Sequence, residues 1–363
     1  MRQNNIFLML LKVFFFSSIL VATSAVRAEL KVVTTIKPLH SLIANVMDGV
    51  GEPALIIEGS TSPHSFTLKP SHAKLLEEAD IIFWVGESIE TFMERPLESI
   101  VKNAEVVEFM EVESINKLKF REESIFEDHD DHDDHDDHDD HDDHDDHDDH
   151  DDHDDHDDHD DHDDHDDHDD HDDHDDHDDH DDHDDHSGHD HHGHAHGEFD
   201  AHIWLDPMNA KEMVHEIAHE LGDLDPANKN KYEANAQATI QALDQLVNDI
   251  EKGINKDAKF VVFHDAYQYF EERFGVRAAG ALTLNTDVLP GAKQIADIQD
   301  VIKDRGIKCI FSEPQFNPKI ITTIAEDMNI KTGVFDPLGA NIDSNKDLYF
   351  TLISNLGDEL KGC

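Results

Sequence analysis

A long run of histidine and aspartate separates the two parts of this chain that can fold. Residues 129–186 repeat His-Asp-Asp without interruption, with twenty histidines at a period of three, and residues 187–197 add five more histidines. Such a segment has almost no apolar residues, so it cannot bury a core, and we expect it to be disordered. Compact structure must therefore form from the sequence on either side of it.

Most of the negative charge lies in this His/Asp-rich tract, which we define as residues 127–198. The chain of 363 residues carries a formal net charge of −58; the tract holds 40 Asp, 2 Glu and no Lys or Arg, which accounts for −42 and leaves −16 for the rest. A charge of −16 is ordinary for a solvated surface, and no basic patch offsets it. The balance therefore argues against nucleic acid and anionic membranes as partners.

The tract has the composition of a weak metal binder. Neutral imidazole suits zinc, nickel, copper and cobalt, and carboxylates add charge and oxygen ligands. Nothing fixes the geometry of such sites, so we expect binding to be unselective. Two interpretations stay open: the tract collects metal for a fixed site nearby, or it is a solvating acidic segment that grew by repeat slippage.

The first 28 residues have the features of a secretory signal. Apolar runs surround Lys12, and small residues follow, with Val26 and Ala28 at the positions that a signal peptidase recognises. The alternative is a membrane anchor, but the run after Lys12 is short for a spanning helix. We expect cleavage after Ala28 and an exported, soluble chain that is not lipid-anchored, because no cysteine lies near the cut.

The chain has two cysteines, Cys309 and Cys363. In an exported protein an even pair predicts one disulfide, although two unpaired thiols are the alternative. A bridge here would hold the C-terminus in place, which otherwise tends to fray.

Short β-rich runs alternate with helical stretches on both sides of the tract. The predicted helices include residues 39–47 and a helix capped by Ser71. Alternation of this kind favours an α/β fold with two similar lobes, each built on a mainly parallel sheet. The predicted strands are residues 30–36, 81–85, 105–109, 260–263, 308–311 and 330–335.

One long helix is predicted to join the two lobes. Asp225 is its expected cap and Pro226 its expected first residue, and one apolar stripe runs along it at helical spacing. The stripe consists of Tyr232, Ala236, Ile240, Leu243, Val247 and Ile250. The expected domains are a signal peptide at 1–28, an N-terminal lobe at 29–126, the disordered tract at 127–198, the end of the N-terminal lobe at 199–224, the linking helix at 225–252 and a C-terminal lobe at 253–363.

Three histidines outside the tract occupy loop positions. His64 follows the apolar residues 55–57, His202 lies in AHIWLDP just after the tract, and His264 directly follows FVVF. Asp336, which follows GVF, occupies a similar position. Ligands of open α/β sheets bind beyond the carboxyl ends of strands, and zinc takes three or four N, S or O ligands. The set is therefore a candidate zinc site, although a single loop histidine is more often a surface residue.

A second histidine motif competes with this set. His215, Glu216 and His219 match H-E-x-x-H, the pattern of zinc proteases. The apolar residues of the same helix form its buried stripe, which places both histidines on the opposite, solvated face. We interpret His40 and His72 as structural or surface residues that begin or border helices, with His40 also able to line a cleft.

Several stretches together resemble one known family. They are TTIKPLHSLIANVMDGV, SPHSFTLKPSHAKLLEEADIIFWVGESIETFM, HIWLDP, VFHDAYQYFEERFGV, PGAKQIADI, FSEPQFNP and FDPLGANI. In order and spacing they resemble the zinc-binding component of the bacterial high-affinity zinc uptake ABC transporter (ZnuA type), a solute-binding protein of the cluster A-I class. Members are similar in carrying a histidine-rich insertion before HIWLDP and a C-terminal disulfide like Cys309 with Cys363.

The resemblance implies one metal in a cleft between two α/β lobes. It implies His64 and His202 as ligands from the N-terminal lobe and His264 from the C-terminal lobe. The fourth ligand varies in the family between water, Glu and Asp; Pro63 stands where some members have the Glu, and Asp336 matches the position of the Asp. Relatives of manganese type replace the third histidine by Glu, so His264 favours zinc.

The resemblance also implies a function. The expected protein is a periplasmic, monomeric zinc-binding protein that is not an enzyme. It delivers Zn²⁺ to the membrane permease of an ABC transporter, and a periplasmic auxiliary metal chaperone is a further candidate partner. Three alternatives stay open: a periplasmic metal buffer that acts through the tract, a zinc hydrolase that uses His215 and His219, and a surface adhesin.

Overall fold

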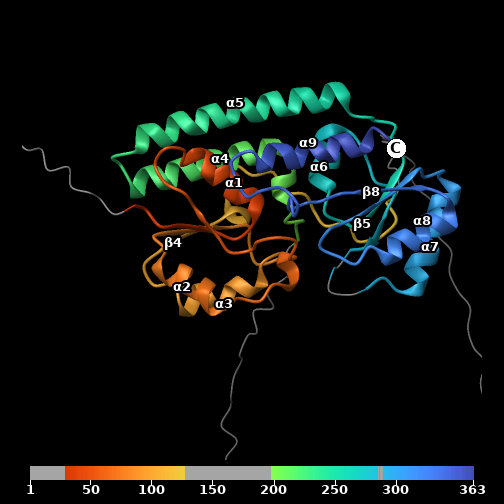
Figure 1. Cartoon of the computed structure of the whole chain (residues 1–363), viewed down its shortest axis with the longest axis horizontal. Helices are drawn as coiled ribbons and strands as arrows, with labels where there is room; N and C mark the ends of the chain where they lie inside the picture. The colour runs from red at the N-terminus through yellow and green to blue at the C-terminus, as the bar shows by residue number, and fades with distance from the viewer. Residues whose placement is uncertain (1–28, 127–197, 285, 287–288) are drawn as a thin grey trace, which may run out of the picture. The chain divides into compact units, whose positions relative to one another are not determined.

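The computed structural model describes residues 29–126, 198–284, 286 and 289–363. The predicted secretory signal lies outside these residues, as does all of the His/Asp-rich tract except Glu198. The described residues form two four-stranded parallel sheets with helices around them, as Figure 1 shows. The predicted fold class, two α/β lobes with parallel sheets, is confirmed.

The two sheets have the same strand arrangement. The N-terminal sheet has the order β2-β1-β3-β4 and the C-terminal sheet the order β6-β5-β7-β8, and neighbouring strands in both are parallel. In both, the second strand along the sheet is the first in the chain. The strands are β1 (Val32–Thr34), β2 (Ala54–Leu55), β3 (Ile81–Trp84), β4 (Glu105–Glu108), β5 (Phe260–His264), β6 (Ala281–Thr283), β7 (Cys309–Ser312) and β8 (Lys331–Val334).

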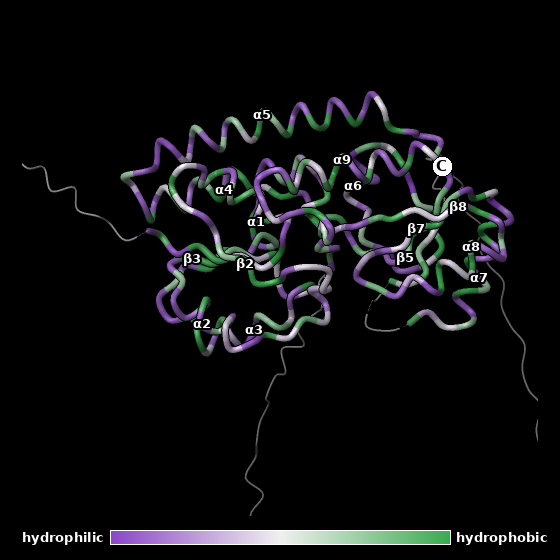
Figure 2. The backbone as a smooth tube through the Cα atoms, in the orientation of Figure 1, coloured by the Kyte–Doolittle hydropathy of each residue, from purple (hydrophilic) through white to green (hydrophobic). Residues whose placement is uncertain are grey.

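Strand β5 shows why its sheet needs helices on both faces. All five residues are buried. Phe260 and Val262 pack in the larger hydrophobic cluster together with α9, whereas Val261 and Phe263 pack in a second cluster with α7 and α8. A strand covered on both faces has no polar alternation, as a continuous apolar run such as FVVF predicts. Figure 2 shows the same hydrophobic character at β3 of the other sheet.

The helices surround the sheets, and the longest, α5, packs on α4, α1 and α9. Figure 1 shows α5 running along α4 and α9. No helix among the described residues is both long and apolar enough to cross a bilayer. The helices are α1 (Lys37–Val46), α2 (Pro70–Glu78), α3 (Glu94–Ser99), α4 (Pro207–Leu224), α5 (Lys229–Gly253), α6 (Gln268–Phe274), α7 (Ala292–Asp304), α8 (Lys319–Met328) and α9 (Leu348–Leu360), with short 3₁₀ turns η1 (Pro63–Ser65), η2 (Thr91–Met93), η3 (Phe109–Glu111) and η4 (Ile203–Leu205).

The start of the long helix differs from the prediction. Helix α5 begins at Lys229, not at Pro226. Asp225 instead ends α4, because its backbone N–H donates to the carbonyl of Leu221, and its carboxylate accepts a 2.6 Å hydrogen bond from the Asn228 side chain. The aspartate therefore stabilises the turn between two helices rather than the first turn of the second one.

The start of α2 also differs. Pro70 is its first residue, and Lys69, not Ser71, is the cap. The backbone N–H of Lys69 donates to Nδ1 of His72 at 3.2 Å. Proline at the first position has a suitable φ and lacks the N–H that would go unsatisfied there, which explains why it displaces the serine.

The segment that leads into the tract pairs with the C-terminal sheet. The N–H of Phe126 donates to the carbonyl of Ala279, and the N–H of Ala281 donates to the carbonyl of Ser124. Gly280 faces this segment, and a Cβ there would lie 2.6 Å from the Ser124 oxygen. Residues from before the tract thus cover the start of β6, which is the edge strand of the C-terminal sheet. The sequence does not indicate this pairing.

Polar contacts also join residues 337–349 to Trp204, just after the tract, and to Lys37, near the N-terminus of the described residues. The Trp204 indole N–H donates to the carbonyl of Pro337, and the Tyr349 hydroxyl donates to the carbonyl of Trp204. The buried Lys37 ammonium donates to the carbonyl of Gly339 at 2.6 Å. These bonds fix the chain where it passes from β8 to α9.

The predicted disulfide between Cys309 and Cys363 is present, with 54 residues of separation and a Cα–Cα distance of 5.6 Å. Cys309 begins the buried strand β7, and Cys363 ends the chain just after α9. The bridge therefore fastens the last helix to the C-terminal sheet.

We expect Cys363→Ser to lower the free energy of unfolding by about 4 kcal/mol, because a closed loop of this length restricts the unfolded chain. Chemical denaturation under oxidising conditions measures the change. A variant as stable as the wild type would contradict the expectation, and the same experiment on the reduced wild type is the control.

A buried carboxyl group lies beneath the loop after β3. Glu90 is fully buried, and its Oε2 accepts hydrogen bonds from the backbone N–H groups of Val85 at 2.8 Å and Gly86 at 3.2 Å. Burial raises the pKa of Glu90 from 4.5 to about 7. Two N–H donors thus do not compensate for the loss of water around the charged form.

This group makes stability depend on pH. A carboxyl whose pKa is higher in the folded state favours folding while protonated, and that contribution is lost as pH rises from about 4.5 to about 7. Glu90→Gln keeps an acceptor but cannot ionise. We expect the stability of the variant relative to wild type to increase by up to about 3 kcal/mol between about pH 4 and about pH 8. Denaturation at both pH values measures this, and an equal difference at both would refute it.

Candidate metal centre

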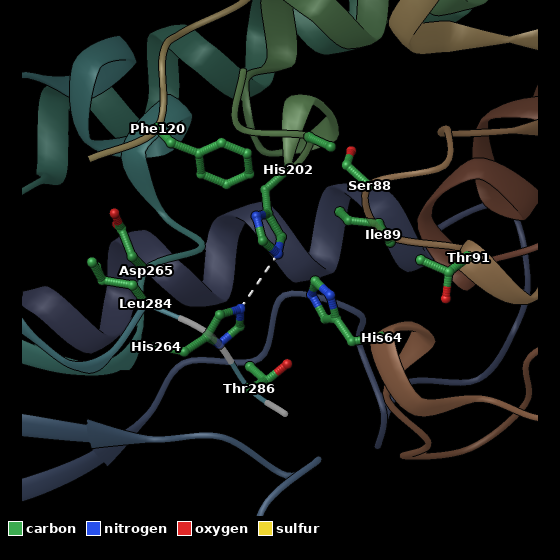
Figure 3. A pocket seen from close by; sticks show the side chains of 11 residues that line it. His64, Ser88, Ile89, Thr91, Phe120, His202, His264, Asp265, Leu284 and Thr286 are labelled. Atoms are coloured by element: carbon green, nitrogen blue, oxygen red, sulfur yellow. Dashed lines mark hydrogen bonds between the residues drawn. The ribbon is translucent and has the colours of Figure 1, made fainter. Parts of the chain in front are cut away.

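Three histidines from distant parts of the chain converge on one point. His64, His202 and His264 each offer one ligand nitrogen, and these atoms lie within 4.8 Å of one another. The ring centroids are 5.2 Å apart for His202 and His264 and 5.6 Å for His64 and His202. Figure 3 shows the three rings turned toward a common centre.

The parallel sheets explain why these residues meet. His264 is the last residue of β5, at the carboxyl end of its sheet. His64 lies in the 3₁₀ turn η1 after β2, where Pro63 fixes the backbone, and His202 precedes η4. Just beyond η4, Asp206 accepts a hydrogen bond from the N–H of Met208 and so fixes the start of α4. The centre thus lies beyond the carboxyl ends of strands, where open α/β sheets bind ligands.

Two buried carboxylates orient two of the rings. Nδ1 of His202 donates to Asp200 at 2.7 Å, and Nδ1 of His264 donates to Glu313 at 2.7 Å. A proton on Nδ1 leaves Nε2 as the metal-binding atom, and the hydrogen bond raises the basicity of the ring. Asp200 and Glu313 are buried, which protects both bonds from competition with water.

The spacing of the nitrogens suits a metal ion. The Nε2 atoms of His202 and His264 are 3.3 Å apart, which equals the roughly 3.3 Å expected between two ligands of a tetrahedral zinc ion. Nε2 of His64 is buried and has no hydrogen-bond partner among the described residues. A buried acceptor without a partner is costly, and a metal ion at the common centre would satisfy it.

The electrostatics of the three rings are unequal. Burial, followed by the influence of neighbouring histidines, lowers the pKa of His64 and of His202 well below 6.5. Burial acts on His264 too, but the Glu313, Asp265 and Asp200 carboxylates together outweigh it and raise the pKa of His264. Without metal, a proton on Nε2 of His264 can therefore be shared with Nε2 of His202.

Two acidic groups beside the histidines are shifted as well. Burial raises the pKa of Asp200 and of Asp265 to about 7 each. A divalent cation among the histidines would favour the ionised form of both groups. Metal binding therefore favours ionisation of these two carboxyl groups, and their ionised form in turn favours metal binding.

A cavity of about 330 Å³ opens onto the three histidines. Among its described residues the carboxylate is Asp265, and Arg121 already pairs with it. The described part of the wall combines hydroxyl groups and apolar side chains, so it leaves room for water beside the centre and offers no unpaired carboxylate. It is lined by His64, Ser88, Ile89, Thr91, Phe120, Ala201, His202, His264, Asp265, Leu284 and Thr286.

Asp336, the fourth candidate, is engaged elsewhere. Its Oδ1 accepts from the backbone N–H groups of Leu338 and Gly339, and its Oδ2 accepts from Ala340. The side chain of Gln315 donates to Oδ1 as well. Asp336 therefore caps the turn after β8, and the metal-compatible cluster of described residues does not include it.

The remaining histidines among the described residues lie apart from the centre. His215 and His219 lie on the exposed side of α4, as the apolar stripe predicts, so their helix does not present them to a buried metal. Nε2 of His40 lies 3.1 Å from the carbonyl of Pro53, and His72 caps α2. These contacts give His40 and His72 structural roles.

Sequence reasoning did not identify the residues that support the ligands. Asp200 precedes His202 by two positions, and Glu313 follows β7 as directly as His264 ends β5. Both positions carried a usable signal, since neighbouring parallel strands end at the same edge. Arg121 carried none, because its partners are more than 140 positions away in sequence.

Comparisons with known proteins identify related sequences. A family model described as "Zinc-uptake complex component A periplasmic" (ZnuA) matches residues 32–363. The high-affinity zinc uptake system protein ZnuA of Brucella abortus (strain 2308) is 46% identical over 334 residues, which cover 92% of this chain and 91% of that protein.

Solved structures share the fold. A crystal structure of ZnuA has a TM-score of 0.63 at 18% identity and covers 91% of this chain and 98% of its own. The laminin-binding protein Lmb of Streptococcus agalactiae, described as bifunctional with adhesin and metal-transporting activity, has a TM-score of 0.62 at 22% identity, with 92% and 100% coverage. At these identities the likeness concerns the fold alone.

Metal binding at this centre should weaken in acid. A metal must displace the proton on His264, whose pKa is raised, so the affinity should fall about tenfold per pH unit below that pKa. His64 and His202 should not add to this loss, because their pKa values are already low, whereas protonation of Asp200 and Asp265 below about pH 7 should steepen it. Competition titrations from pH 8 to pH 5 measure the trend, and calorimetry in two buffers counts the protons released. An affinity that stays constant over this range would exclude the mechanism.

Proposed function

This chain belongs to the family of the periplasmic component A of the zinc-uptake complex, and from that premise we propose that it captures one Zn²⁺ ion between its two lobes for import. The observation that carries the proposal is the convergence of three histidine nitrogens, two of them at the ligand spacing of zinc. The same set comes from both halves of the chain, as a cleft site requires.

The proposed ligands are Nε2 of His64, His202 and His264. Water from the adjoining cavity takes the fourth position, since the carboxylates nearby are paired or used in turns. Three imidazoles make a nitrogen-rich set that favours zinc over manganese, which prefers carboxylate and water oxygens. Copper would bind such ligands more tightly, so the supply of metal in the compartment also decides which ion is carried.

The proposed role is transport without chemical turnover. The exported protein acts in the periplasm as a soluble monomer and delivers zinc to the membrane permease of an ABC transporter. A periplasmic auxiliary metal chaperone is a further candidate partner. The relatives named for zinc uptake support this role, and the buried, pre-oriented ligands suit tight retention of one ion better than hydrolysis.

Deletion of residues 128–196 tests the site against the tract. We expect one tight zinc site per chain to survive this deletion, since all three proposed ligands lie outside it, and His264→Ala should then abolish that site. His219→Ala is the matched control, because this histidine is exposed on α4. Titration with a competing zinc chelator gives stoichiometry and affinity for each variant.

Two other outcomes would count against the proposal. Loss of all tight binding with the tract would mean that the protein is a metal buffer that acts through its repeat. Loss of the tight site in His219→Ala, with His264→Ala unaffected, would place zinc at the H-E-x-x-H motif instead.

A further inference from the structure

A buried arginine joins the segment before the tract to the loop that carries His264. The two terminal nitrogens of Arg121 donate to different carboxylates, to Asp265 at 2.9 Å and to Glu271 at 2.6 Å. Its side chain is 15% exposed, and the centre of its guanidinium lies 4.1 Å from the centroid of the Phe126 ring. A planar fork between two carboxylates and over an aromatic face is a geometry that lysine cannot reproduce.

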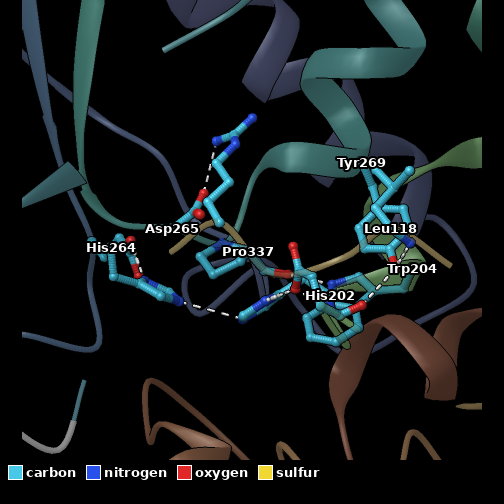
Figure 4. A network of polar contacts seen from close by, with 10 residues as sticks. Leu118, His202, Trp204, His264, Asp265, Tyr269 and Pro337 are labelled. Atoms are coloured by element: carbon cyan, nitrogen blue, oxygen red, sulfur yellow. Dashed lines mark hydrogen bonds and ion pairs between the residues drawn. The ribbon is translucent and has the colours of Figure 1, made fainter. Parts of the chain in front are cut away.

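The partners of Arg121 are direct neighbours of the metal ligands. Asp265 follows His264 in the chain, and Asp200, which also interacts electrostatically with Arg121, accepts the Nδ1–H of His202. Figure 4 shows His202, His264 and Asp265 within one polar network. The three carboxylates around the arginine are each buried, so its charge offsets negative charge that water does not reach.

The backbone of this region is tied to the same network. The hydroxyl of Tyr269, on α6, donates to the carbonyl of Asp200 at 2.5 Å and accepts from the N–H of Leu118. Residues before the tract, after the tract and in α6 thus meet within one group of contacts. Arg121 lies three residues beyond Leu118, and its bond to Asp265 connects this group of contacts to the residue that follows His264.

We propose that Arg121 is a positioning residue of the zinc centre. Its two-pronged ion pair holds the loop from His264 to Glu271 so that His264 and His202 keep their 3.3 Å spacing before metal arrives. Ligands that are already in place need not be ordered when the ion binds, and that saving appears as affinity. The inference rests on the proposed function and adds a residue that does not touch the ion.

A second arginine provides a matched control. Arg273 lies on α6 and donates two hydrogen bonds to Asp206, at 2.7 and 2.8 Å. This pair also ends near the centre, but it joins α6 to Asp206, which lies four positions beyond His202 and caps α4. Both pairs should therefore contribute to folding, whereas only the Arg121 pair adjoins a ligand.

The test compares Arg121→Gln, Arg121→Lys and Arg273→Gln in the full chain, and again in chains that lack residues 128–196, where the repeat cannot bind zinc. Zinc affinity is measured against a chelator, stability by thermal unfolding, and ligand geometry by the visible spectrum of the Co²⁺-loaded protein. We expect Arg121→Gln to weaken zinc binding by about 10- to 100-fold, the usual effect of losing a group that orients a ligand, and to alter the Co²⁺ spectrum. The zinc affinity of Arg121→Lys should lie between that of Arg121→Gln and that of the wild type.

Arg273→Gln should lose stability but keep the affinity and the spectrum of the wild type. The proposal is overturned if Arg121→Gln binds zinc as tightly as the wild type, or if Arg273→Gln loses as much affinity. If Arg121→Gln does not fold, Arg121→Lys decides the question, since wild-type affinity in that variant would exclude a need for the fork. Failure of the wild type to bind zinc in the same assay would instead refute the proposed function.

Discussion

Hydrogen bonds from two histidine rings to buried carboxylates determine what the rest of this molecule can do. Asp200 and Glu313 each accept a 2.7 Å bond from Nδ1 of a histidine. These bonds hold the rings of His202 and His264 with Nε2 toward a common centre. The sheets supply the positions, since β5 and β7 end side by side and place His264 next to Glu313. Without these bonds the rings of His202 and His264 would be free to rotate and to form hydrogen bonds elsewhere.

The arrangement stores unfavourable charge around the centre. Asp200, Asp265, Glu271 and Glu313 are buried, and Arg121 offsets part of their charge. Buried carboxylates lose hydration and are weak evidence of stability by themselves. A divalent cation recovers this loss by direct attraction, so the region is more favourable with metal than without it. Stability and metal affinity are thus linked through the same side chains.

The sequence predicted the strands well because burial on both faces leaves a simple pattern. FVVF and IIFWV are continuous apolar runs, and both form central strands. The two-residue strand β2 and the three-residue strand β6 were missed, since elements this short contain no period. The helix start at Asp225 was wrong because aspartate stabilises turns as readily as helix ends, and only the contact with Asn228 decides between them.

The site was predictable in part for similar reasons. His64, His202 and His264 stand in loops and match a family pattern, with His264 at the end of an apolar strand, and the structure brings them together. Asp336 stands at an equally suitable strand end, but three backbone N–H groups of its own turn bind its oxygens. Strand position shows which residues can reach a site, whereas local backbone hydrogen bonds decide which of them remain available. Arg121 depends on contacts across the chain that no local pattern reveals.

The anchoring of the chain on both sides of the tract has a consequence for sequence change. On one side Phe126 is held by Ala279 and by Arg305, and on the other Glu198 and Phe199 pair with Lys119 and Phe120. The entropy of closing a loop grows only with the logarithm of its length, so doubling or halving it changes stability by about 0.6 kcal/mol. The number of repeats can therefore change greatly between generations while the folded protein and its histidines stay as they are.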